Sequence, residues 1–342
     1  MYEPYTIKDI AKALGLSTST VSRALRGSYE ISQETKKLVL EYAEKINYRP
    51  NPIALSLKER RSRAIGIVVC EIANNFFSQI INGIESIAYN RGYNVIITQS
   101  HESYEREVVN VQHLASRSVD GLLVSLSSET TDLAHFTHLH DRGLPIVFFD
   151  RIPKEISTHK VRANNFKGAF EATEHLILNG FKKIAHLTTA AHLSTTAERL
   201  EGYQAALQKY DIPFRPELVE YCHQGGKIAD DIEQAVYRQI NLKDPAAAFF
   251  AASDRLSIGC LKALKKFNIS VPSQIAIAGF TNSDATDLLN PPLTSVRQPA
   301  FEMGQIATEM LIQILESRYP IEDFETRTLD TELFVRDSTK VL

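Results

Sequence analysis

The sequence has 342 residues, of which 44% are hydrophobic, with 38 Lys and Arg, 41 Asp and Glu, three Cys and no Trp. This length predicts more than one domain, each able to bury a sizeable core. No segment approaches the roughly 20 apolar residues that a membrane span needs. The start Met1-Tyr2-Glu3-Pro4 carries no apolar signal segment, so we expect a cytoplasmic protein that is associated with the nucleoid when it binds DNA. Cys70, Cys222 and Cys260 lie far apart, which predicts small core residues in a reducing compartment rather than disulfides or a metal site.

The net charge of −3 hides an uneven distribution along the chain. Residues 1–63 contain 12 Lys and Arg against 7 Asp and Glu, a net charge of +5, and the remaining residues carry −8. A basic segment that neutralises phosphates releases counterions from DNA, whereas an acidic body has no such affinity. The charge pattern therefore favours a nucleic-acid partner for the first 63 residues.

Two short helices are predicted at 6–14 and 18–25. Thr6 with Asp9 resembles a capping box, Gly15 suits the left-handed residue that ends a helix, and Ser17 is a good N-cap for the second helix. The expected inner faces are Ile7, Ile10, Ala11 and Leu14 in the first helix, and Val21, Ala24 and Leu25 in the second.

The second helix is too polar on one side to be ordinary core. Thr18, Ser19, Ser22 and Arg23 point mostly outward, which suits a helix that enters a DNA major groove. The alternative is a small helical bundle that binds a protein or dimerises. A third helix should begin after Ser32, with a buried stripe of Thr35, Leu38, Val39, Tyr42, Ala43 and Ile46.

A tether follows at 47–63. Pro50 ends the third helix, and Asn51 with Pro52 could begin a helix of about one and a half turns at 53–57, too short to be stable alone in water. The segment could be a plain linker, but Leu55 and Leu57 are apolar residues that need a partner.

These motifs resemble the LacI (lactose repressor) family. The matching runs are T-I-K-D-I-A-K-A-L-G-L-S-T-S-T-V-S-R-A-L and Y-R-P-N-P-I-A-L-S-L. The resemblance implies a dimer on a pseudo-palindromic operator, with the start of the second helix and its arginine reading base edges and Leu57 wedged into the minor groove. The chain has no C-terminal leucine heptad, so we expect no tetramer. The implied DNA-binding residues are Thr6, Ser17, Thr18, Ser19, Thr20, Ser22, Arg23, Asn51, Ala54 and Leu57.

From residue 64 onward, short apolar runs alternate with helical stretches, which indicates parallel sheets. The runs are 65–70, 95–98, 121–126, 146–149, 184–187, 247–252 and 275–280. About 280 residues exceed one sheet, so we expect two α/β lobes. The resemblance implies a two-lobed periplasmic-binding-protein-like body behind a small all-α helix-turn-helix head, with chain crossings near 161–164, 290–293 and 320–323. The predicted domains are a head at 1–50, a hinge helix and tether at 51–63, an N-terminal lobe at 64–161 plus 293–322, and a C-terminal lobe at 162–292 plus 323–342.

Ligands of open α/β sheets bind beyond the carboxyl ends of the strands, so polar and aromatic residues there are effector-site candidates. Several have a plain structural alternative: Phe76 and Phe77 could be core, Asp150 and Arg151 a structural ion pair, and Asp254 a helix cap. The resemblance adds Arg199 as the effector-binding arginine. The full candidate set is Asn75, Phe76, Phe77, Asp150, Arg151, Asn165, Thr195, Arg199, Asp254, Thr281 and Asn282.

One departure from the family bears on the ligand. Thr281 stands where many members carry an aspartate, so the usual carboxylate contact is missing or comes from elsewhere. An aromatic residue with Asp, Arg and Asn still suits a ring and its hydroxyls, and we predict a sugar or sugar derivative as effector. The alternatives are a purine, a phosphorylated metabolite or a protein co-regulator.

Other function classes fit less well. The chain lacks the glycine-rich phosphate loops of nucleotide enzymes and any evident nucleophile–base pair, so we expect neither catalysis nor a cofactor. His135, His138 and His140 are expected on the surface of a polar helix rather than at a metal. A secreted sugar-transport protein would need a signal segment, and an architectural DNA-binding protein would leave the long body without a role. The predicted partners are operator DNA, an effector and a second copy of the chain, with no membrane.

Overall fold

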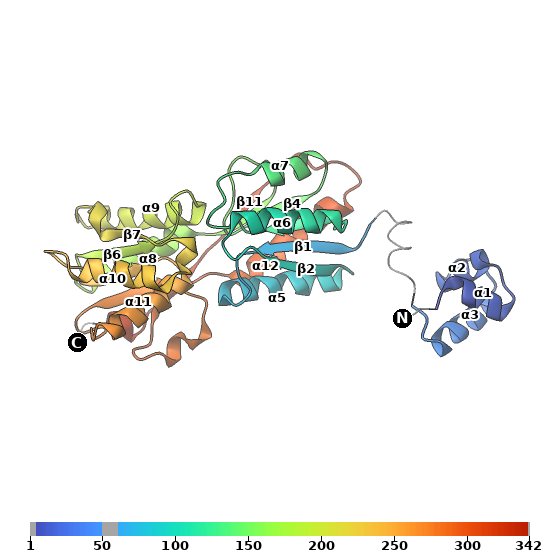
Figure 1. The fold of residues 1–342 in the computed structure, drawn as a ribbon, viewed down its shortest axis with the longest axis horizontal. Helices are drawn as coiled ribbons and strands as arrows, with labels where there is room; N and C mark the ends of the chain where they lie inside the picture. Colours follow the sequence, from blue (N-terminus) through green and yellow to red (C-terminus); the bar gives the residue numbers. More distant parts are fainter. Residues whose placement is uncertain (1–4, 50–60, 341–342) are drawn as a thin grey trace. The chain divides into compact units, whose positions relative to one another are not determined.

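The computed structural model describes residues 5–49 and 61–340 (Figure 1). The chain divides between Arg63 and Ala64 into two compact units, a small helical head and a larger α/β body. The two units are described separately.

The head consists of α1 (Ile7–Leu14), α2 (Thr18–Leu25) and α3 (Gln33–Lys45). The predicted capping residues lie where expected. The Asp9 carboxylate accepts hydrogen bonds from the Thr6 N–H at 2.8 Å and from its hydroxyl at 2.7 Å, and these bonds lower the pKa of Asp9. Gly15 ends α1 at φ +63°, and the Ser17 hydroxyl accepts the Thr20 N–H at 3.0 Å. Local capping thus sets the turn between the two helices.

Six small or branched side chains form the core of the head: Ile10, Ala11, Val21, Ala24, Val39 and Ala43. The prediction for α3 is wrong at Leu38, which is 47% exposed. Val39 and Ala43 fill the narrow space against α1 and α2, while Leu38 lies on the adjacent, solvent-facing side of the helix. The core therefore takes a narrower stripe of α3 than the hydrophobic spacing suggests.

The body contains two sheets of six strands each, ordered β11-β5-β4-β3-β1-β2 and β12-β10-β9-β8-β6-β7. All strand pairs are parallel except β10 with β12. The first lobe is built from β1 (Ala64–Val69), α5 (Asn75–Asn90), β2 (Asn94–Gln99), α6 (Tyr104–Ser116), β3 (Gly121–Val124), α7 (Ala134–Asp141), β4 (Ile146–Phe149), β5 (Lys160–Ala163), α12 (Ala300–Glu316) and β11 (Thr326–Leu329).

The second lobe repeats this arrangement around the second sheet. Its elements are α8 (Asn165–Leu178), β6 (Ile184–Thr188), α9 (Ser194–Lys209), β7 (Val219–Tyr221), α10 (Ala229–Ile240), β8 (Ala248–Ala251), α11 (Asp254–Lys266), β9 (Ala276–Phe280), β10 (Thr294–Arg297) and β12 (Glu332–Phe334). All seven apolar runs of the sequence are found as strands, and the carboxyl ends of the strands in each lobe carry the loops of the cleft.

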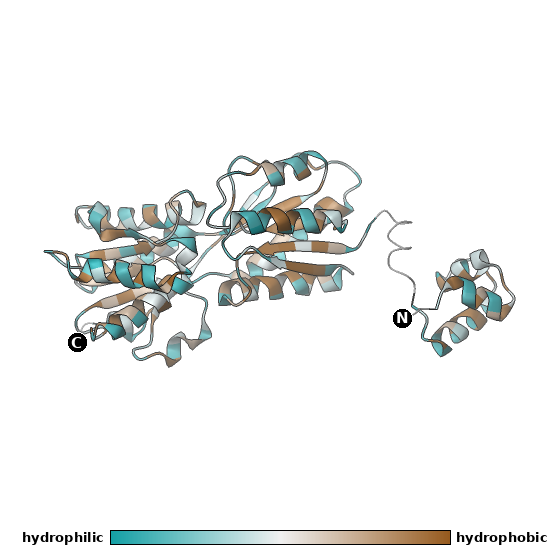
Figure 2. Ribbon diagram, in the orientation of Figure 1, coloured by the Kyte–Doolittle hydropathy of each residue, from teal (hydrophilic) through white to brown (hydrophobic). Residues whose placement is uncertain are grey.

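Helices cover both faces of each sheet, so each lobe has two hydrophobic cores (Figure 1). In the first lobe α5 and α12 lie on one face and α6 with α7 on the other. In the second lobe α8 and α9 share one face, and α10 and α11 share the other. The central strands are hydrophobic along their length, whereas the helices combine hydrophobic and hydrophilic sides (Figure 2). This pattern is typical of parallel sheets buried on both faces.

The predicted lobe boundaries differ from the strand pairing. β5 extends to Ala163 and pairs with β4, so the first crossing follows Ala163, within the predicted 161–164, and only the lobe boundary predicted at 161 is two residues early. β10 pairs with β9 in the second lobe, which moves the second crossing from 290–293 to the residues between β10 and α12. β11 pairs with β5 in the first lobe, so the third crossing lies between β11 and β12 rather than at 320–323. Both β10 and β11 are only four residues long and rich in polar side chains, so they carry no hydrophobic run and only their pairing assigns them to a lobe.

Candidate functional site

The outward face of α2 is a cluster of hydroxyls. The Ser17 Oγ lies 2.8 Å from the Ser19 Oγ and 2.8 Å from the Thr20 Oγ1. Thr18 and Ser19 are exposed at the first turn of the helix, while Thr20 and Ser22 are half-buried. The start of α2 therefore presents hydroxyls and free backbone N–H groups together, which suits phosphates and base edges alike.

Arg23 extends from the same helix and forms an ion pair. Its Nη1 lies 3.2 Å from the Glu30 carboxylate, and both side chains are about half exposed. An exposed pair of this kind contributes little to stability, so a DNA base can replace Glu30 at small cost. Asn51, Ala54 and Leu57, the other predicted DNA contacts, lie outside the described residues, and Thr6 is the capping residue of α1.

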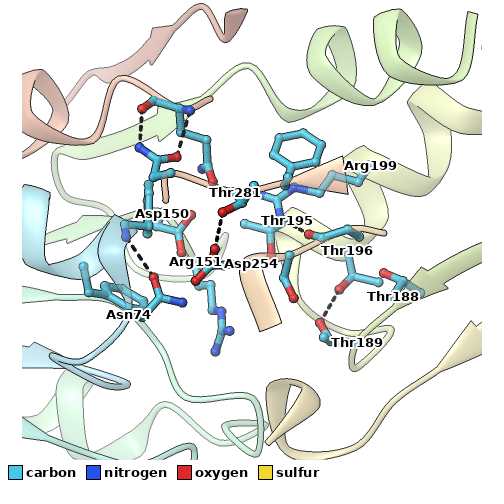
Figure 3. Close-up of a pocket in the computed structure, with 17 residues that line it drawn as sticks. Asn74, Asp150, Arg151, Thr188, Thr189, Thr195, Thr196, Arg199, Asp254 and Thr281 are labelled. Carbon is cyan, nitrogen blue, oxygen red and sulfur yellow. Dashed lines mark hydrogen bonds between the residues drawn. The ribbon is translucent and has the colours of Figure 1, made fainter. Parts of the chain in front are cut away.

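The body has a pocket where the strand ends of its two lobes face each other (Figure 3). The space between the side chains is about 570 Å³, part of it open solvent. It is lined by Asn74, Phe76, Phe77, Asp150, Arg151, Thr188, Thr189, Thr195, Thr196, Arg199, Ala252, Ser253, Asp254, Phe280, Thr281, Asn282 and Gln298. Nine of the eleven predicted effector residues are among them.

On the first lobe, the start of α5 supplies aromatic rings. Phe76 and Phe77 are buried, lie edge to face with centroids 5.3 Å apart, and both line the pocket and join the core. The structural and the ligand-contact interpretations therefore both apply. Asn75 does not line the pocket, contrary to prediction; Asn74 does, because it is the N-cap whose side-chain carbonyl accepts the Phe76 N–H at 2.9 Å.

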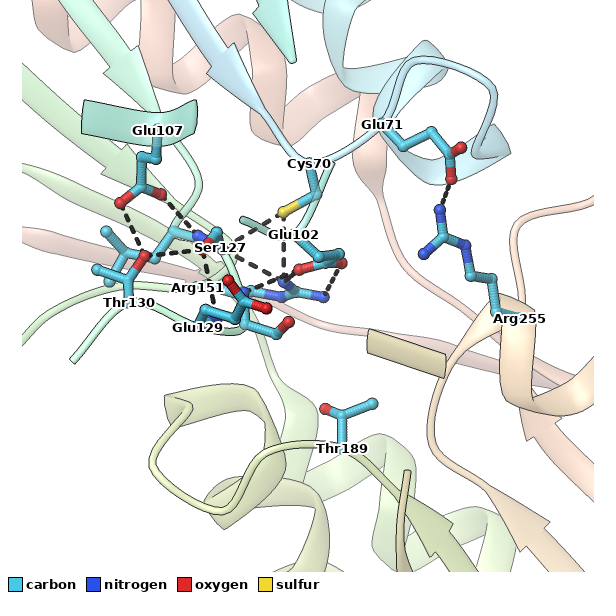
Figure 4. Close-up of polar contacts among 12 residues, drawn as sticks. Cys70, Glu71, Glu102, Glu107, Ser127, Glu129, Thr130, Arg151, Thr189 and Arg255 are labelled. Atoms are coloured by element: carbon cyan, nitrogen blue, oxygen red, sulfur yellow. Dashed lines mark hydrogen bonds and ion pairs between the residues drawn. The ribbon is translucent and has the colours of Figure 1, made fainter. Parts of the chain in front are cut away.

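Arg151 is held by a carboxylate that the sequence did not single out (Figure 4). Its Nη1 and Nη2 donate to the two oxygens of Glu102 at 2.7 and 3.1 Å, and Nη1 also approaches the Cys70 sulfur at 3.2 Å. Burial by itself would lower the pKa of Arg151, but Cys70 and Glu102 raise it above its ordinary value. Burial would raise the pKa of Glu102, yet Arg151 lowers it. Arg151 therefore forms a structural ion pair, but with Glu102, whereas the sequence-based alternative paired it with Asp150.

On the second lobe, Arg199 projects from α9 across the end of the sheet. Its Nε and Nη2 donate to the side-chain oxygen Oδ1 of Asn165 at 2.9 and 2.8 Å, and its Nη1 donates to the backbone carbonyl of Ala252. Its guanidinium carbon lies 3.9 Å from the centre of the Phe280 ring. Burial lowers the pKa of Arg199 to about 10. Asn165 itself does not line the pocket, contrary to prediction; its side chain accepts from Arg199 and donates to Glu198 instead.

Two carboxylates complete the pocket. Asp150 follows β4 with a left-handed φ of +59°, and burial raises its pKa. Asp254 begins α11 but does not cap it, since the cap is Ser253. The Thr281 hydroxyl donates to Asp254, whose pKa burial nevertheless raises. The carboxylate that Thr281 lacks is thus supplied by Asp254 on the neighbouring strand end.

Several contacts join the two lobes around the pocket. Asn282 donates to Gln79 of α5 at 2.8 Å and accepts the Gln298 N–H at 3.1 Å. Glu71, beyond the end of β1, forms an ion pair with Arg255 of α11 (Figure 4). The lobes are therefore closed on each other in this structure, and a change in their orientation would break these bonds.

Sequence reasoning missed several lining residues, for two different reasons. Thr188 is the last residue of β6 and Thr189 follows it, and this strand was predicted, so the rule that identified Asp150 would have found both. Gln298 follows β10, which was not predicted as a strand, and no local signal marks it.

The expectation that the histidines of α7 lie on the surface is wrong for His135. Its side chain is 6% exposed, and its Nε2 lies 3.1 Å from the fully buried Glu107 carboxylate, which also accepts from Ser127 and Thr130. Within residues 5–49 and 61–340, no group of three His, Cys, Asp or Glu residues is arranged to hold a metal ion. None of the described helices is both long and apolar enough to cross a membrane.

Residues 6–51 match the family described as bacterial regulatory proteins, lacI family, and residues 173–339 match the periplasmic binding protein-like domain. The transcriptional repressor PurR of Vibrio vulnificus (strain CMCP6) is 30% identical over 335 residues, which cover 98% of each chain. The chain belongs to the LacI family.

Two solved structures of related proteins have the same architecture as this LacI-family regulator. A complex of the transcriptional regulator CelR with cellobiose is 28% identical with a TM-score of 0.72, and covers 98% of this chain and 99% of that one. The lac repressor dimer bound to operator and the anti-inducer ONPF has a TM-score of 0.83 at 23% identity, and covers 99% and 100% of the two chains. The protein is thus a helix-turn-helix transcriptional regulator with a periplasmic-binding-protein-like domain, as the sequence motifs predicted.

Proposed function

We propose that this regulator is a repressor that binds a pseudo-palindromic operator as a dimer in the cytoplasm and responds to a sugar or sugar derivative in the cleft of its body. The observation that carries the proposal is a pocket lined by aromatic, hydroxyl and charged side chains between two lobes, in a chain with a DNA-binding head. We assign no catalytic step to the pocket.

In the head, we assign base reading to Thr18, Ser19 and Arg23, and phosphate contacts to the other hydroxyls of α2. The exposed start of α2 and the exposed ion pair of Arg23 with Glu30 support this assignment. We assign residues 51–63 to the hinge, with Asn51, Ala54 and Leu57 at the minor groove, on the family resemblance.

The sugar assignment rests on the chemistry of the pocket. Phe76 and Phe77 offer rings against which a sugar face can pack, and Asp150 and Asp254 offer carboxylates that accept hydrogen bonds from hydroxyls. The related regulator CelR forms a complex with cellobiose, which agrees with the assignment.

Control follows from linkage between the pocket and the head. A ligand that favours one orientation of the two lobes changes the contacts between them, such as Glu71 with Arg255 and Asn282 with Gln79. We propose that this reorientation changes the spacing of the two hinges in the dimer. A coupling of about 1–3 kcal/mol would change operator affinity by roughly one to two decades.

The dimer face is assigned to α5 and α6 of the first lobe. Tyr89 at the end of α5 is 76% exposed, Val109 of α6 is 47% exposed, and Ile97 of the neighbouring edge strand β2 is 37% exposed. Apolar side chains gathered on adjacent elements are typical of a surface that another protein covers.

The proposal is tested by fluorescence anisotropy with operator DNA at fixed salt, with and without a panel of mono- and disaccharides. We expect at least one sugar or sugar derivative to change operator affinity about tenfold or more. A purine that does so, with no sugar or sugar derivative bound in calorimetry, would reject the sugar assignment.

Arg23→Ala should weaken specific operator binding by about 1–3 kcal/mol while sparing ligand binding. Unchanged operator affinity would remove Arg23 from the reading set. Leu57→Ala should leave the head folded and reduce both affinity and DNA bending, and an undiminished bend angle would reject the wedge.

A further inference from the structure

Arg199 is a buried cation without a direct ion pair, although the more distant Asp150 carboxylate favours its charged form. Its residue is 7% exposed, yet no carboxylate oxygen in the described parts of the chain lies within 4.0 Å of its guanidinium. Its three hydrogen bonds go to neutral carbonyl oxygens and use three of its five N–H donors. Burying an unpaired charge is costly, so the two remaining donors suit an acceptor of opposite charge.

The first turn of α9 lies against the same pocket and is uncapped. Its N-cap is Leu193, which offers no side-chain acceptor, and the first bonded amide is Ala197 N–H to the Leu193 carbonyl at 3.1 Å. Among the described residues, the amides of Thr195 and Thr196 have no acceptor. The N-terminus of a sixteen-residue helix with free N–H groups carries a partial positive charge.

Two threonine hydroxyls point to a ligand independently of the helix. Thr188, at the end of β6, is fully buried and lines the pocket, and its Oγ1 has no hydrogen-bond partner. Thr195 is 5% exposed and also lines the pocket, and its hydroxyl makes no hydrogen bond to the described parts of the protein. By contrast, the Thr189 and Thr196 hydroxyls bond each other at 3.1 Å. An unpaired buried hydroxyl is unusual unless another molecule pairs with it.

The charged side chains of the pocket are unevenly placed, with Arg151 close to the two carboxylates and Arg199 apart from them. Figure 3 shows Arg199 and the four threonines on one side of the pocket, with Asp150 and Asn74 on the other and Asp254 between them. A ligand that fits both sides has hydroxyls toward the carboxylates and an anionic group toward α9.

We propose that the effector is a phosphorylated sugar whose phosphoryl group binds at the start of α9, between Thr188, Thr195 and Arg199. The inference rests on the proposed ligand-controlled function and names the class of its ligand. Two amides, two hydroxyls and two guanidinium N–H groups make six donors, more than the two oxygens of a carboxylate accept comfortably but suited to the three terminal oxygens of a phosphoryl group.

The test uses the full-length protein and begins with inorganic phosphate as the probe. We expect about 10 mM phosphate to raise the thermal midpoint of the body relative to chloride at equal ionic strength. In calorimetry, glucose 6-phosphate and ribose 5-phosphate are compared with glucose and ribose. At least one phosphorylated sugar should bind about tenfold or more tightly than its parent sugar.

Variants locate the site. Thr195→Val and Thr188→Val each remove one unpaired hydroxyl and should reduce the phosphate stabilisation several-fold. Thr137→Val changes an exposed threonine of α7 and should leave that stabilisation intact. Stabilisation that survives in both pocket variants would place the anion elsewhere, for example on the basic head, and would overturn the inference.

The remaining outcomes separate the inference from the function on which it rests. A parent sugar or a sugar acid that binds as tightly as the phosphorylated sugar overturns the phosphoryl site but leaves sugar control standing. Absence of phosphate stabilisation in the wild-type protein also overturns the inference, whatever the sugars do. Failure of every sugar and sugar phosphate to bind rejects the sugar assignment itself.

Discussion

The two lobes each bring a buried arginine to the cleft, and the two arginines differ in what neutralises them. Arg151 of the first lobe forms a bidentate ion pair with Glu102, whereas Arg199 of the second lobe contacts only neutral oxygens and a ring, with Asp150 as a more distant negative charge. A charge that is paired within its own lobe stabilises that lobe and attracts an anionic ligand only weakly. A buried charge without an ion pair lowers the stability of the fold, and binding of an anion restores that stability. The difference suggests a first lobe built for rigidity and a second lobe built for recognition.

The largest expected effect is a loss of stability when the ion pair of Arg151 is broken. Glu102→Gln leaves Arg151 charged, buried and unpaired, and should lower the free energy of unfolding by about 3–5 kcal/mol in urea titration. Glu316→Gln, which breaks the exposed pair with Arg91, is the matched control and should cost less than about 1 kcal/mol. Equal losses in the two variants would mean that Glu102 and Arg151 contribute no more than a surface pair.

The second lobe also buries a titratable side chain, the imidazole of His186 in β6. Its Nδ1 donates to the Phe250 carbonyl at 3.2 Å, its Nε2 has no partner, and burial lowers its pKa to about 3. Between pH 6.5 and 3 the unfolded chain binds this proton and the folded one does not, so stability falls as the pH falls. The loss between pH 7 and pH 5 should be about 2 kcal/mol.

His186→Asn should remove this loss, measured as the change in the free energy of unfolding with pH. Asp150 and Asp254 have raised pKa values and oppose it, since the folded protein then takes up protons first, but they act equally in wild type and variant. A dependence that persists in His186→Asn would contradict a neutral His186.

Arg199→Gln should be far milder for the fold than Glu102→Gln. It removes an uncompensated charge together with three hydrogen bonds, and a net loss of about 1–2 kcal/mol in urea titration is expected. The operator response to the effector should be lost while operator affinity without effector is kept. A stability loss as large as that of Glu102→Gln would show that Arg199 is a structural residue and would end the contrast between the lobes.

The smallest effect concerns a third arginine, Arg23 of the head, which is exposed and paired with Glu30. Glu30→Gln frees Arg23 and removes a negative charge near DNA, so operator affinity should rise about two- to threefold at low salt. Anisotropy titrations at two salt concentrations measure this effect. Weaker binding by the variant would mean that Glu30 orients Arg23 rather than competing with DNA.

Much of the architecture follows from local sequence. The caps at Thr6, Ser17 and Ser32, with Gly15 between the first two helices, define the head because each acts within one helical turn. The seven apolar runs define the central strands because a strand buried on both faces must be hydrophobic along its length. The same reasoning locates Asp150, Asp254 and Thr281 at strand ends.

Tertiary structure decided what the local patterns could not. The pairing of β10 and β11, short strands without an apolar run, sets which lobe they join and moves two crossings. Glu102 pairs with Arg151 across 49 residues, so no spacing rule could connect them. The sequence determined which elements form, because capping and burial patterns act between neighbours. Only the packed lobes decided that Arg151 forms a direct ion pair and Arg199 does not, because charge compensation depends on distances through space.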